Sequence, residues 1–313
     1  MKRVLVTGAN GFIGRELVTV LAETCSVRAA VRDMSNIVPG TFSPEMDVVS
    51  VGNISTETDW SHALEDVDTV VHLAARAHVT KETCTNPIEE FLSVNCNGAV
   101  ALLQQASAYN VSRFVFISSI GVNGNATYGT AFSEEQSPNP VSDYAISKYE
   151  AEQQLKLEAE MLGIELVIVR PALVYGKGAP GNIERLSKLV KMIPVLPFGL
   201  VSNRKSFVFI DNLTSLIKLC VGHPSAVNQI FLAADNQPIS TKHLINILAK
   251  AEGGRVIQLP VPVSFMRFAA RILGKSTLAS QLFDDLVISN EKAKTLLGWN
   301  PVSNLEMTFS KKH

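Results

Sequence analysis

Residues 4–14 read VLVTGANGFIG, a short apolar run with β-branched residues that leads into three glycines. Apolar residues then recur at helical spacing, at Phe12, Leu17, Val18 and Leu21. Strand, glycine turn and helix in this order are the context of a dinucleotide site, in which Gly8 makes the tight turn, Gly11 lets the backbone approach a pyrophosphate and Gly14 lets helix and strand pack closely. The helix N-terminus offers N–H groups and partial positive charge to phosphates.

Length and charge limit the classes of partner. A chain of 313 residues exceeds one typical domain, which indicates a cofactor half and a substrate half. With 28 Lys and Arg against 29 Asp and Glu, no overall field favours nucleic acid or an acidic membrane, so the expected partner is a small molecule. No signal peptide and no apolar run of membrane-spanning length is found, so we expect a soluble, cytoplasmic protein without membrane insertion.

The cysteines show no metal-binding or redox spacing. They lie in or beside apolar stretches, at Cys25, Cys84, Cys96 and Cys220. We interpret them as reduced residues of the core, and no metal site is implied.

Residues 144–148 read YAISK, which places a phenol and an ammonium one helical turn apart on the same face. A free tyrosine titrates near ~10, and a cation held beside it favours the phenolate and brings the pKa toward the working pH. Tyr144 and Lys148 are therefore candidates for an acid/base pair. A solvated helix face is the alternative interpretation of this spacing alone.

The glycine spacing, G-x-x-G-x-x-G, resembles that of the extended short-chain dehydrogenase/reductase family of nucleotide-sugar epimerases, dehydratases and reductases. The resemblance implies an α/β fold: a Rossmann doubly wound parallel sheet with a smaller C-terminal α/β domain for the substrate. We expect residues 1–170 to form the NAD(P)-binding domain and residues 171–313 mainly the substrate domain. A segment near 208–225 is a candidate for return to the first domain.

The cofactor residues follow from this resemblance. They are Gly8, Gly11, Phe12, Ile13, Gly14, Arg32, Asn53, Ile54, Leu73, Ala74, Ala75, Asn95, Ser118, Tyr144, Lys148 and Pro171. Asn53 stands where relatives usually carry an Asp that holds the adenine, and Asn95 is expected to support the active site. Arg32 is the first residue past the second strand, where an arginine accommodates the 2′-phosphate of NADP. We therefore favour NADP(H) over NAD(H). In the alternative, Arg32 is simply exposed and Asp33 reaches the ribose.

Residues 118–124, SSIGVNG, resemble the family's catalytic S-[ST]-x-x-V-Y-G segment. The match makes Ser119 the hydroxyl that bonds the substrate oxygen, and Asn123 replaces the usual Tyr. Dehydratases of the family carry an Asp-Glu pair where this chain has Ile120 and Gly121, so we do not expect dehydration. His72 is interpreted as a packed strand residue, and Arg76 and His78 face either the sugar or solvent.

The substrate residues implied by the resemblance are Ser119, Asn123, Tyr144, Asn182, Phe198, Arg204 and Lys205. Asn182 and the two cations are candidates for the diphosphate, and Phe198 for packing beside the base. An exposed turn is the alternative for Arg204 and Lys205. The family's late P-x-R-x-G-D motif is absent, whereas its K-A-x-x-x-L-G-W-x-P ending is matched near residues 292–301.

The segment 263–274 has basic residues on one side and apolar residues on the other. A basic amphipathic helix can lie on a membrane, and it can equally be an ordinary surface helix of a domain.

The resemblance predicts an NAD(P)H-dependent reductase of UDP-4-keto-6-deoxy-N-acetylhexosamines that acts at sugar C4 in surface polysaccharide synthesis. One alternative is a UDP-hexose 4-epimerase with tightly bound NAD. Others are an NADPH-dependent reductase of a non-nucleotide carbonyl and a non-catalytic NADP-binding regulator. The expected partners are a UDP-sugar and a second copy of the chain, because family members dimerise through the helices near residues 89–108 and 144–162. Burial against the chain's own sheet explains the same helical pattern.

Overall fold

The computed structural model describes residues 2–77, 86–179, 182–302 and 305. At its centre is a sheet of seven strands in the order β10-β6-β5-β4-β1-β2-β3, and every pairing is parallel. The strands are β1 (Arg3–Thr7), β2 (Ser26–Val31), β3 (Asp47–Ser50), β4 (Thr69–His72), β5 (Arg113–Ile117), β6 (Glu165–Pro171) and β10 (Ile230–Ala233). The predicted doubly wound sheet is confirmed.

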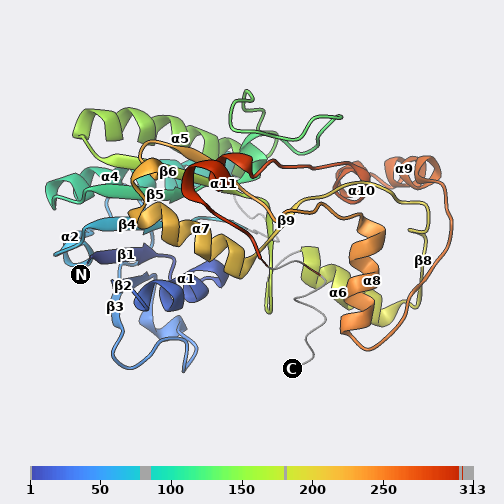
Figure 1. The fold of residues 1–313 in the computed structure, drawn as a ribbon, viewed down its shortest axis with the longest axis horizontal. Helices are drawn as coiled ribbons and strands as arrows, with labels where there is room; N and C mark the ends of the chain where they lie inside the picture. Colours follow the sequence, from blue (N-terminus) through green and yellow to red (C-terminus); the bar gives the residue numbers. More distant parts are fainter. Residues whose placement is uncertain (1, 78–85, 180–181, 303–304, 306–313) are drawn as a thin grey trace.

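Helices cover both faces of the sheet (Figure 1). Successive strand side chains point to opposite faces, so Val4 and Val6 belong to one core cluster and Leu5 to the other. The first cluster includes residues of α1 (Phe12–Ala22), α7 (Ile210–Gly222) and α11 (Glu291–Leu297). The second includes residues of α2 (Ser61–Leu64), α4 (Gly98–Ala108) and α5 (Asp143–Leu162).

The helix before α4 is interrupted. The apolar pattern predicts one helix from Glu89 to Ala108, but α3 (Pro87–Leu92) is followed by a π-helical turn, η2 (Ser93–Asn97), before α4 begins. Such turns are frequent at functional sites.

The chain changes direction across the sheet at its middle. The strands run outward from β1 through β2 to β3, and then β4 lies on the other side of β1. Ligands of open α/β sheets bind in the crevice outside the carboxyl ends of the strands at such a point. A ligand site is therefore expected at the carboxyl ends of β1 and β4.

A second group of elements lies at the opposite end of the molecule from β3 (Figure 1). It contains α6 (Asn182–Met192), α8 (Thr241–Ala251), α9 (Val263–Ile272), α10 (Ser276–Phe283) and the parallel pair β8 (Val195–Leu196) and β11 (Ile257–Gln258). A second parallel pair, β7 (Leu173–Tyr175) and β9 (Phe207–Phe209), follows β6 and precedes α7.

Three elements from the second half of the sequence belong to the layers of the large sheet. These are α7, β10 and α11, and all of them follow residue 171. The division of the chain into domains at residue 170 stays a prediction. Among the residues that the structure describes, no helix is both long and apolar enough to cross a membrane.

Candidate active site

The glycine turn lies against the end of β4. Gly8 has a φ of +66°, which favours glycine, and a Cβ on it would stand 2.9 Å from the Cα of Ala74. A Cβ on Gly14 would overlap the carbonyl oxygen of Gly8 and lie 2.7 Å from the Cα of Ala9. The backbone therefore packs too closely at both positions for any side chain.

The N-terminus of α1 is open to an anion. Its N-cap is Gly11, which brings no side chain, and the first turn contains no acidic residue. Phe12 begins the helix, and its ring lies toward Gly176, where an added Cβ would come within 3.3 Å of the ring Cζ. A helix end of this kind suits a pyrophosphate, and binding at this position stays a prediction.

At the end of β2, Arg32 and Asp33 are both exposed, but they differ in their contacts. The Asp33 carboxylate accepts hydrogen bonds from the Ser35 N–H at 2.8 Å and from Asn36 Nδ2 at 3.2 Å. The bond from Ser35 lowers the pKa of Asp33. In this arrangement the Asp33 carboxylate is engaged by the turn that directly follows it. Asn53 is exposed beyond the end of β3.

Tyr144 and Lys148 lie in the first two turns of α5, which begins where Ser142 Oγ accepts a hydrogen bond from the Ala145 N–H at 3.2 Å. Lys148 is only 1% exposed, and its Nζ has no hydrogen-bond partner among the described residues. The Nζ lies 3.9 Å from the centre of the Phe116 ring. The ammonium is therefore buried and held by a cation–π contact.

Burial decides the pKa of both groups. It lowers the pKa of Lys148 to about 7, against an opposing effect of Glu152, and it raises the pKa of Tyr144 to about 12. The expectation that the ammonium brings the phenol pKa down is thus wrong for this structure, because both groups lose their hydration. At neutral pH the phenol holds its proton.

The two serines after β5 have different surroundings. Ser118 is buried, and its Oγ has no hydrogen-bond partner among the described residues. Ser119 Oγ accepts a hydrogen bond from the Gly121 N–H at 3.1 Å, which leaves its own proton for a substrate oxygen. A Cβ on Gly121 would be 3.3 Å from Ser119 Oγ and 3.2 Å from the Cβ of Ala145. Ser119 therefore stands beside the first turn of α5.

His72 is fully buried at the end of β4, as predicted for a packed strand residue. Its Nδ1 lies 2.8 Å from Thr7 Oγ1, and Thr7 Oγ1 also accepts from the Ala74 N–H at 3.2 Å. Desolvation, and then the charge of Lys148, lower the pKa of His72 to about 3. The ring is therefore neutral at neutral pH.

Asn95 joins three segments at the candidate site. Its Oδ1 accepts from the Arg76 N–H at 2.7 Å, and its Nδ2 donates to the Arg76 carbonyl at 3.1 Å and to Ser147 Oγ at 3.0 Å. Ser147 in turn donates to the Tyr144 carbonyl at 2.8 Å. Both amide protons are used within the protein. The geometry is that of a support for the helix that carries Tyr144, and direct contact with a cofactor stays a prediction.

Asn123 lies away from any open surface. It is buried, with Nδ2 donating to the Ser133 carbonyl at 3.1 Å and Oδ1 accepting from Arg170 Nη1 at 2.9 Å. Both ends of its amide are engaged inside the protein, and the expected contact with the substrate stays a prediction.

The sequence patterns did not reveal the partner of Arg170. Glu152, one turn beyond Lys148 on α5, is fully buried and binds the Arg170 guanidinium through both oxygens, at 2.9 and 2.5 Å. The fold thus buries two basic side chains and one acidic side chain close together, at Lys148, Glu152 and Arg170. An acid four residues after the lysine and an arginine in an apolar strand are the signals that could have found the pair.

The remaining cofactor candidates lie around the same strand ends. Leu73, Ala74 and Ala75 follow β4 and are partly buried, and Pro171 is the buried last residue of β6. Ile54 is partly buried against the second core cluster, near Gly98 of α4. Ile13 is partly buried against the first.

The predicted substrate residues of the second half are spread out. Asn182 begins α6, and its side chain lies outside the described part of the chain. Phe198 is 6% exposed and packs in a core cluster with Val190 and Ile245, and its assignment to the substrate stays a prediction. His78 and Cys84 also lie outside the described residues.

Arg204 and Lys205 lie beside two carboxylates. Arg204 is exposed, and its N–H donates to Asp285 Oδ1 at 2.8 Å. Burial lowers the pKa of Lys205, and Asp284 and Asp285 oppose this shift. The segment after Asp285 also bonds to Thr127, through the Thr127 N–H and the Asp285 carbonyl at 2.8 Å. The turn at residues 204–205 is thereby tied to the loop that follows Ser119.

These residues fit a nicotinamide dinucleotide. Two buried polar atoms, Lys148 Nζ and Ser118 Oγ, have no hydrogen-bond partner among the described residues, although such groups are normally satisfied. Ser118 directly follows β5, and Lys148 lies near the start of α5. The glycine turn before α1 packs against Ala74, which follows β4. Ribose hydroxyls and phosphates are ligands that these donors can accommodate.

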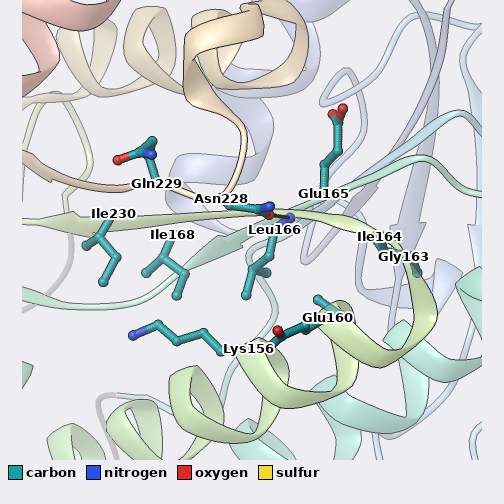
Figure 2. A pocket seen from close by; sticks show the side chains of 11 residues that line it. Lys156, Glu160, Gly163, Ile164, Glu165, Leu166, Ile168, Asn228, Gln229 and Ile230 are labelled. Carbon is teal, nitrogen blue, oxygen red and sulfur yellow. Dashed lines mark hydrogen bonds between the residues drawn. The ribbon is translucent and has the colours of Figure 1, made fainter.

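A hollow of about 450 Å³ lies elsewhere, between the second half of α5 and the strands β6 and β10 (Figure 2). Lys156 and Ile230 are among the residues that line it. At a rise of 1.5 Å per residue, Lys156 is roughly 18 Å along the helix from Tyr144. The hollow is therefore separate from the candidate active site.

Comparison with known proteins gives the family. The sequence profile of the NAD dependent epimerase/dehydratase family matches residues 4–234. The chain belongs to this family. It is accordingly an NAD(P)-dependent enzyme, and a UDP-glucose 4-epimerase of Vibrio cholerae is 39% identical to it over 98% of this chain and 93% of that protein. The N-acetyl-alpha-D-glucosaminyl-diphospho-ditrans,octacis-undecaprenol 4-epimerase of Escherichia coli O157:H7 is 24% identical over 88% of this chain and 80% of its own length.

Two solved structures share the fold. The UDP-glucose 4-epimerase of Thermotoga maritima with UDP-glucose superposes with a TM-score of 0.76 at 22% identity, covering 98% of this chain and 97% of that one. The UDP-glucuronic acid 4-epimerase of Bacillus cereus in complex with NAD gives 0.79 at 22% identity, with 98% and 94% covered. The match extends across both halves of the chain.

Proposed function

We propose that this chain is a UDP-hexose 4-epimerase that keeps its nicotinamide dinucleotide bound through the reaction. The observation that carries the proposal is the buried Lys148 ammonium, which has no hydrogen-bond partner among the described residues and stands one turn from Tyr144. The identity of 39% to a UDP-glucose 4-epimerase over 98% of the chain supports the choice among reactions of the family.

Tyr144 is the proposed acid/base. Epimerisation at a sugar carbon requires that a hydroxyl proton is removed and later returned to the same oxygen, so one residue can serve both steps. Burial raises the pKa of the Tyr144 phenol to about 12 in this structure. In the proposed cycle the Tyr144 phenolate takes the hydroxyl proton as the sugar carbon loses its hydride, and the resulting phenol returns the proton to the carbonyl oxygen when the hydride comes back. A bound nicotinamide dinucleotide supplies the hydride transfer to and from the sugar carbon.

Lys148 and Ser119 complete the acid/base site. Burial lowers the pKa of Lys148 to about 7. The proposed role of its charged form, one helical turn from Tyr144, is to stabilise the phenolate during the reaction, against the desolvation that raises the phenol pKa in this structure. The Ser119 hydroxyl, whose oxygen already accepts from the Gly121 N–H, is oriented to donate to the substrate oxygen. Asn95 and Ser147 hold the backbone of Tyr144 in place.

Two assays together test the proposal. The purified chain is denatured and the released dinucleotide is identified and quantified, and the native chain is incubated with UDP-glucose and with UDP-N-acetylglucosamine without added cofactor. We expect about one NAD per chain and conversion to the 4-epimer. Dinucleotide-free protein that shows no conversion would contradict the proposal.

A 4-ketoreductase remains the second candidate, and the exposed Arg32 at the end of β2 favours it. An arginine there suits NADP(H), which exchanges with the solution in a net reduction. In this case the chain would consume added NADPH with a UDP-4-keto-6-deoxy-N-acetylhexosamine. The preference for NADP(H) is part of this candidate and stays a prediction.

The group that carries the sugar is a separate question. A nucleoside diphosphate is proposed from the Vibrio cholerae relative, whereas the name of the Escherichia coli relative describes a sugar on a diphosphate-linked polyprenol. Offering both types of substrate in the same conversion assay separates them.

We also propose that the outer side of α5 binds a second copy of the chain. Leu157 and Met161 are exposed there at helical spacing, and the resemblance predicts a dimer through this helix and α4. Native mass spectrometry should give twice the chain mass, and Leu157→Ser with Met161→Ser should shift the protein to monomer. A monomeric unmodified chain would contradict this expectation.

A further inference from the structure

The helix α9 is apolar on two opposite faces. Val263 and Met266 point inward and pack against the core cluster that contains Ile245. Phe265, Phe268 and Ile272 do not share that face, and in a helix their spacing of three and four residues places them together on the other side.

The outer face of α9 is largely exposed. Phe265 is 64% exposed, Phe268 61% and Ile272 70%. Leu273, which follows α9 directly, is 68% exposed, and Leu278 of α10 is 49% exposed. Single exposed apolar residues are ordinary, but a contiguous group with two aromatic rings marks an interaction site.

The same segment carries a concentrated positive charge. The sequence from residue 254 to residue 283 contains the cations Arg255, Arg267, Arg271 and Lys275 and no acidic residue, in a chain whose net charge is −1. Arg267 is paired with Asp284, whereas Arg271 and Lys275 are exposed at the end of α9 and just beyond it. The cations therefore lie alongside the apolar residues.

Neighbouring elements extend the apolar surface of this end of the molecule. Exposed side chains lie at the end of α6 and along the β8 and β11 pair, at Met192, Val195, Ile257 and Leu259. In Figure 1 α9, α10 and β8 lie together at the end farthest from β3. We define the basic apolar patch as Phe265, Phe268, Arg271, Ile272, Leu273, Lys275 and Leu278.

We propose that the basic apolar patch binds the surface of an anionic lipid membrane, with α9 lying in the plane of the head groups. Aromatic and aliphatic side chains in line with arginine and lysine are the composition of an interfacial helix. Negatively charged lipid head groups supply the opposite charge that no acidic residue of this segment provides.

Two features favour a membrane over other occupants. A second copy that paired through the same patch would set Arg271 and Lys275 against like charges, since a symmetric interface brings identical surfaces together. With ten residues, α9 is too short to cross a bilayer, so binding would be to the surface. The proposal does not depend on which reaction the enzyme catalyses.

The test is co-sedimentation of the full chain with vesicles. Vesicles of neutral phosphatidylcholine are compared with vesicles that contain about one third phosphatidylglycerol, at low and high salt. We expect about tenfold more bound protein on the anionic vesicles at low salt, and a strong decrease at high salt. Equal or absent binding to both vesicle types overturns the proposal.

Two variants separate the apolar and charged contributions. Phe265→Ser with Phe268→Ser and Ile272→Ser should lower binding about tenfold, and Arg271→Glu with Lys275→Glu should remove the preference for anionic lipid. Leu296→Ser with Val302→Ser, at exposed apolar positions of the large-sheet half, is the matched control and should bind as the unmodified chain does.

Unchanged far-ultraviolet circular dichroism shows that the variants are folded. A control variant that loses binding as the patch variants do contradicts the proposal. So does a patch variant that keeps its vesicle binding but changes the oligomeric state by mass photometry, because the patch would then be an interface between copies of the chain.

Discussion

Lys148 carries an ammonium that the fold buries among apolar groups. The Nζ has a ring contact with Phe116 but no hydrogen-bond partner among the described residues. A polar group in this state costs free energy of folding unless a ligand satisfies it. We interpret the cost as part of a site prepared for cofactor hydroxyls.

Without cofactor, we expect Lys148→Met to be more stable than the unmodified chain, by an amount that depends on pH. Burial lowers the pKa of Lys148 from 10.5 to about 7, so between these values the unfolded chain binds more protons than the folded chain. The stability therefore rises with pH through this window, and the penalty is greatest below pH 7. The free energy of unfolding of Lys148→Met should exceed that of the unmodified chain by about 1–3 kcal/mol at pH 6. The difference should be smaller at pH 9.

Urea unfolding of cofactor-free protein at the two pH values measures this difference. Lys250→Met is the control, because Lys250 is exposed at the end of α8, and it should change the free energy of unfolding little at either pH. A Lys148→Met variant that is less stable than the unmodified chain at pH 6 would show that the ammonium has a partner in the folded state.

Tyr144→Phe should lower kcat about 10²–10⁴-fold while leaving the fold intact. The change removes only the hydroxyl, and the ring contact with Phe91, at 6.3 Å between centroids, is kept. Steady-state kinetics on the substrate identified above, with Tyr149→Phe as the matched control on the same helix, measure the effect. Full activity of Tyr144→Phe would remove the residue from the proposed acid/base role.

At the scale of the elements, the turn between β1 and α1 leaves no room for a side chain at Gly8 or Gly14. Gly14→Ala places a methyl group on the carbonyl oxygen of Gly8 and 2.7 Å from the Cα of Ala9. We expect a loss of about 1–3 kcal/mol in stability and a marked decrease in dinucleotide affinity, measured by thermal unfolding and fluorescence titration. Gly222→Ala at the end of α7, where an added Cβ meets no atom within 4 Å, is the control.

The helix α5 is joined to β6 by an ion pair inside the fold. Glu152→Gln leaves the Arg170 guanidinium buried without its charge partner, which typically costs about 3–5 kcal/mol. Chemical denaturation should show a loss of this size, and Glu160→Gln, exposed on the same helix, should show almost none. A loss below about 1 kcal/mol would mean that solvent reaches the pair.

The pattern of strands and helices could be predicted well from the sequence where periodicity and turns carry the information. The apolar run before the three glycines is β1, and the residues at helical spacing after them, Phe12 to Leu21, lie in α1. The π-helical turn at residues 93–97 could not be predicted from the apolar spacing, and it contains Asn95, whose side chain bonds to the Arg76 backbone 19 residues earlier. Likewise Phe198 is interior because residues of several elements distant in sequence, among them Val190, Ile245 and Phe283, pack around it.

For the molecule as a whole, the first half was easier to predict than the second. The glycine turn, Ser119 and the Tyr144 helix meet at one end of the sheet because parallel strands place their carboxyl ends on a common edge. The second half lacks such a rule, and its assigned residues, Phe198 and Arg204, are separated into an interior position and an exposed turn.

The measurement that most directly tests the central claim follows deuterium at sugar C4. UDP-glucose labelled at this carbon is incubated with the enzyme and an excess of unlabelled free NAD and NADPH, and the product is analysed by mass spectrometry. An epimerase that retains its dinucleotide should give UDP-galactose that keeps nearly all of the label. Loss of the label to the free cofactor pool, or no UDP-galactose at all, would contradict the account.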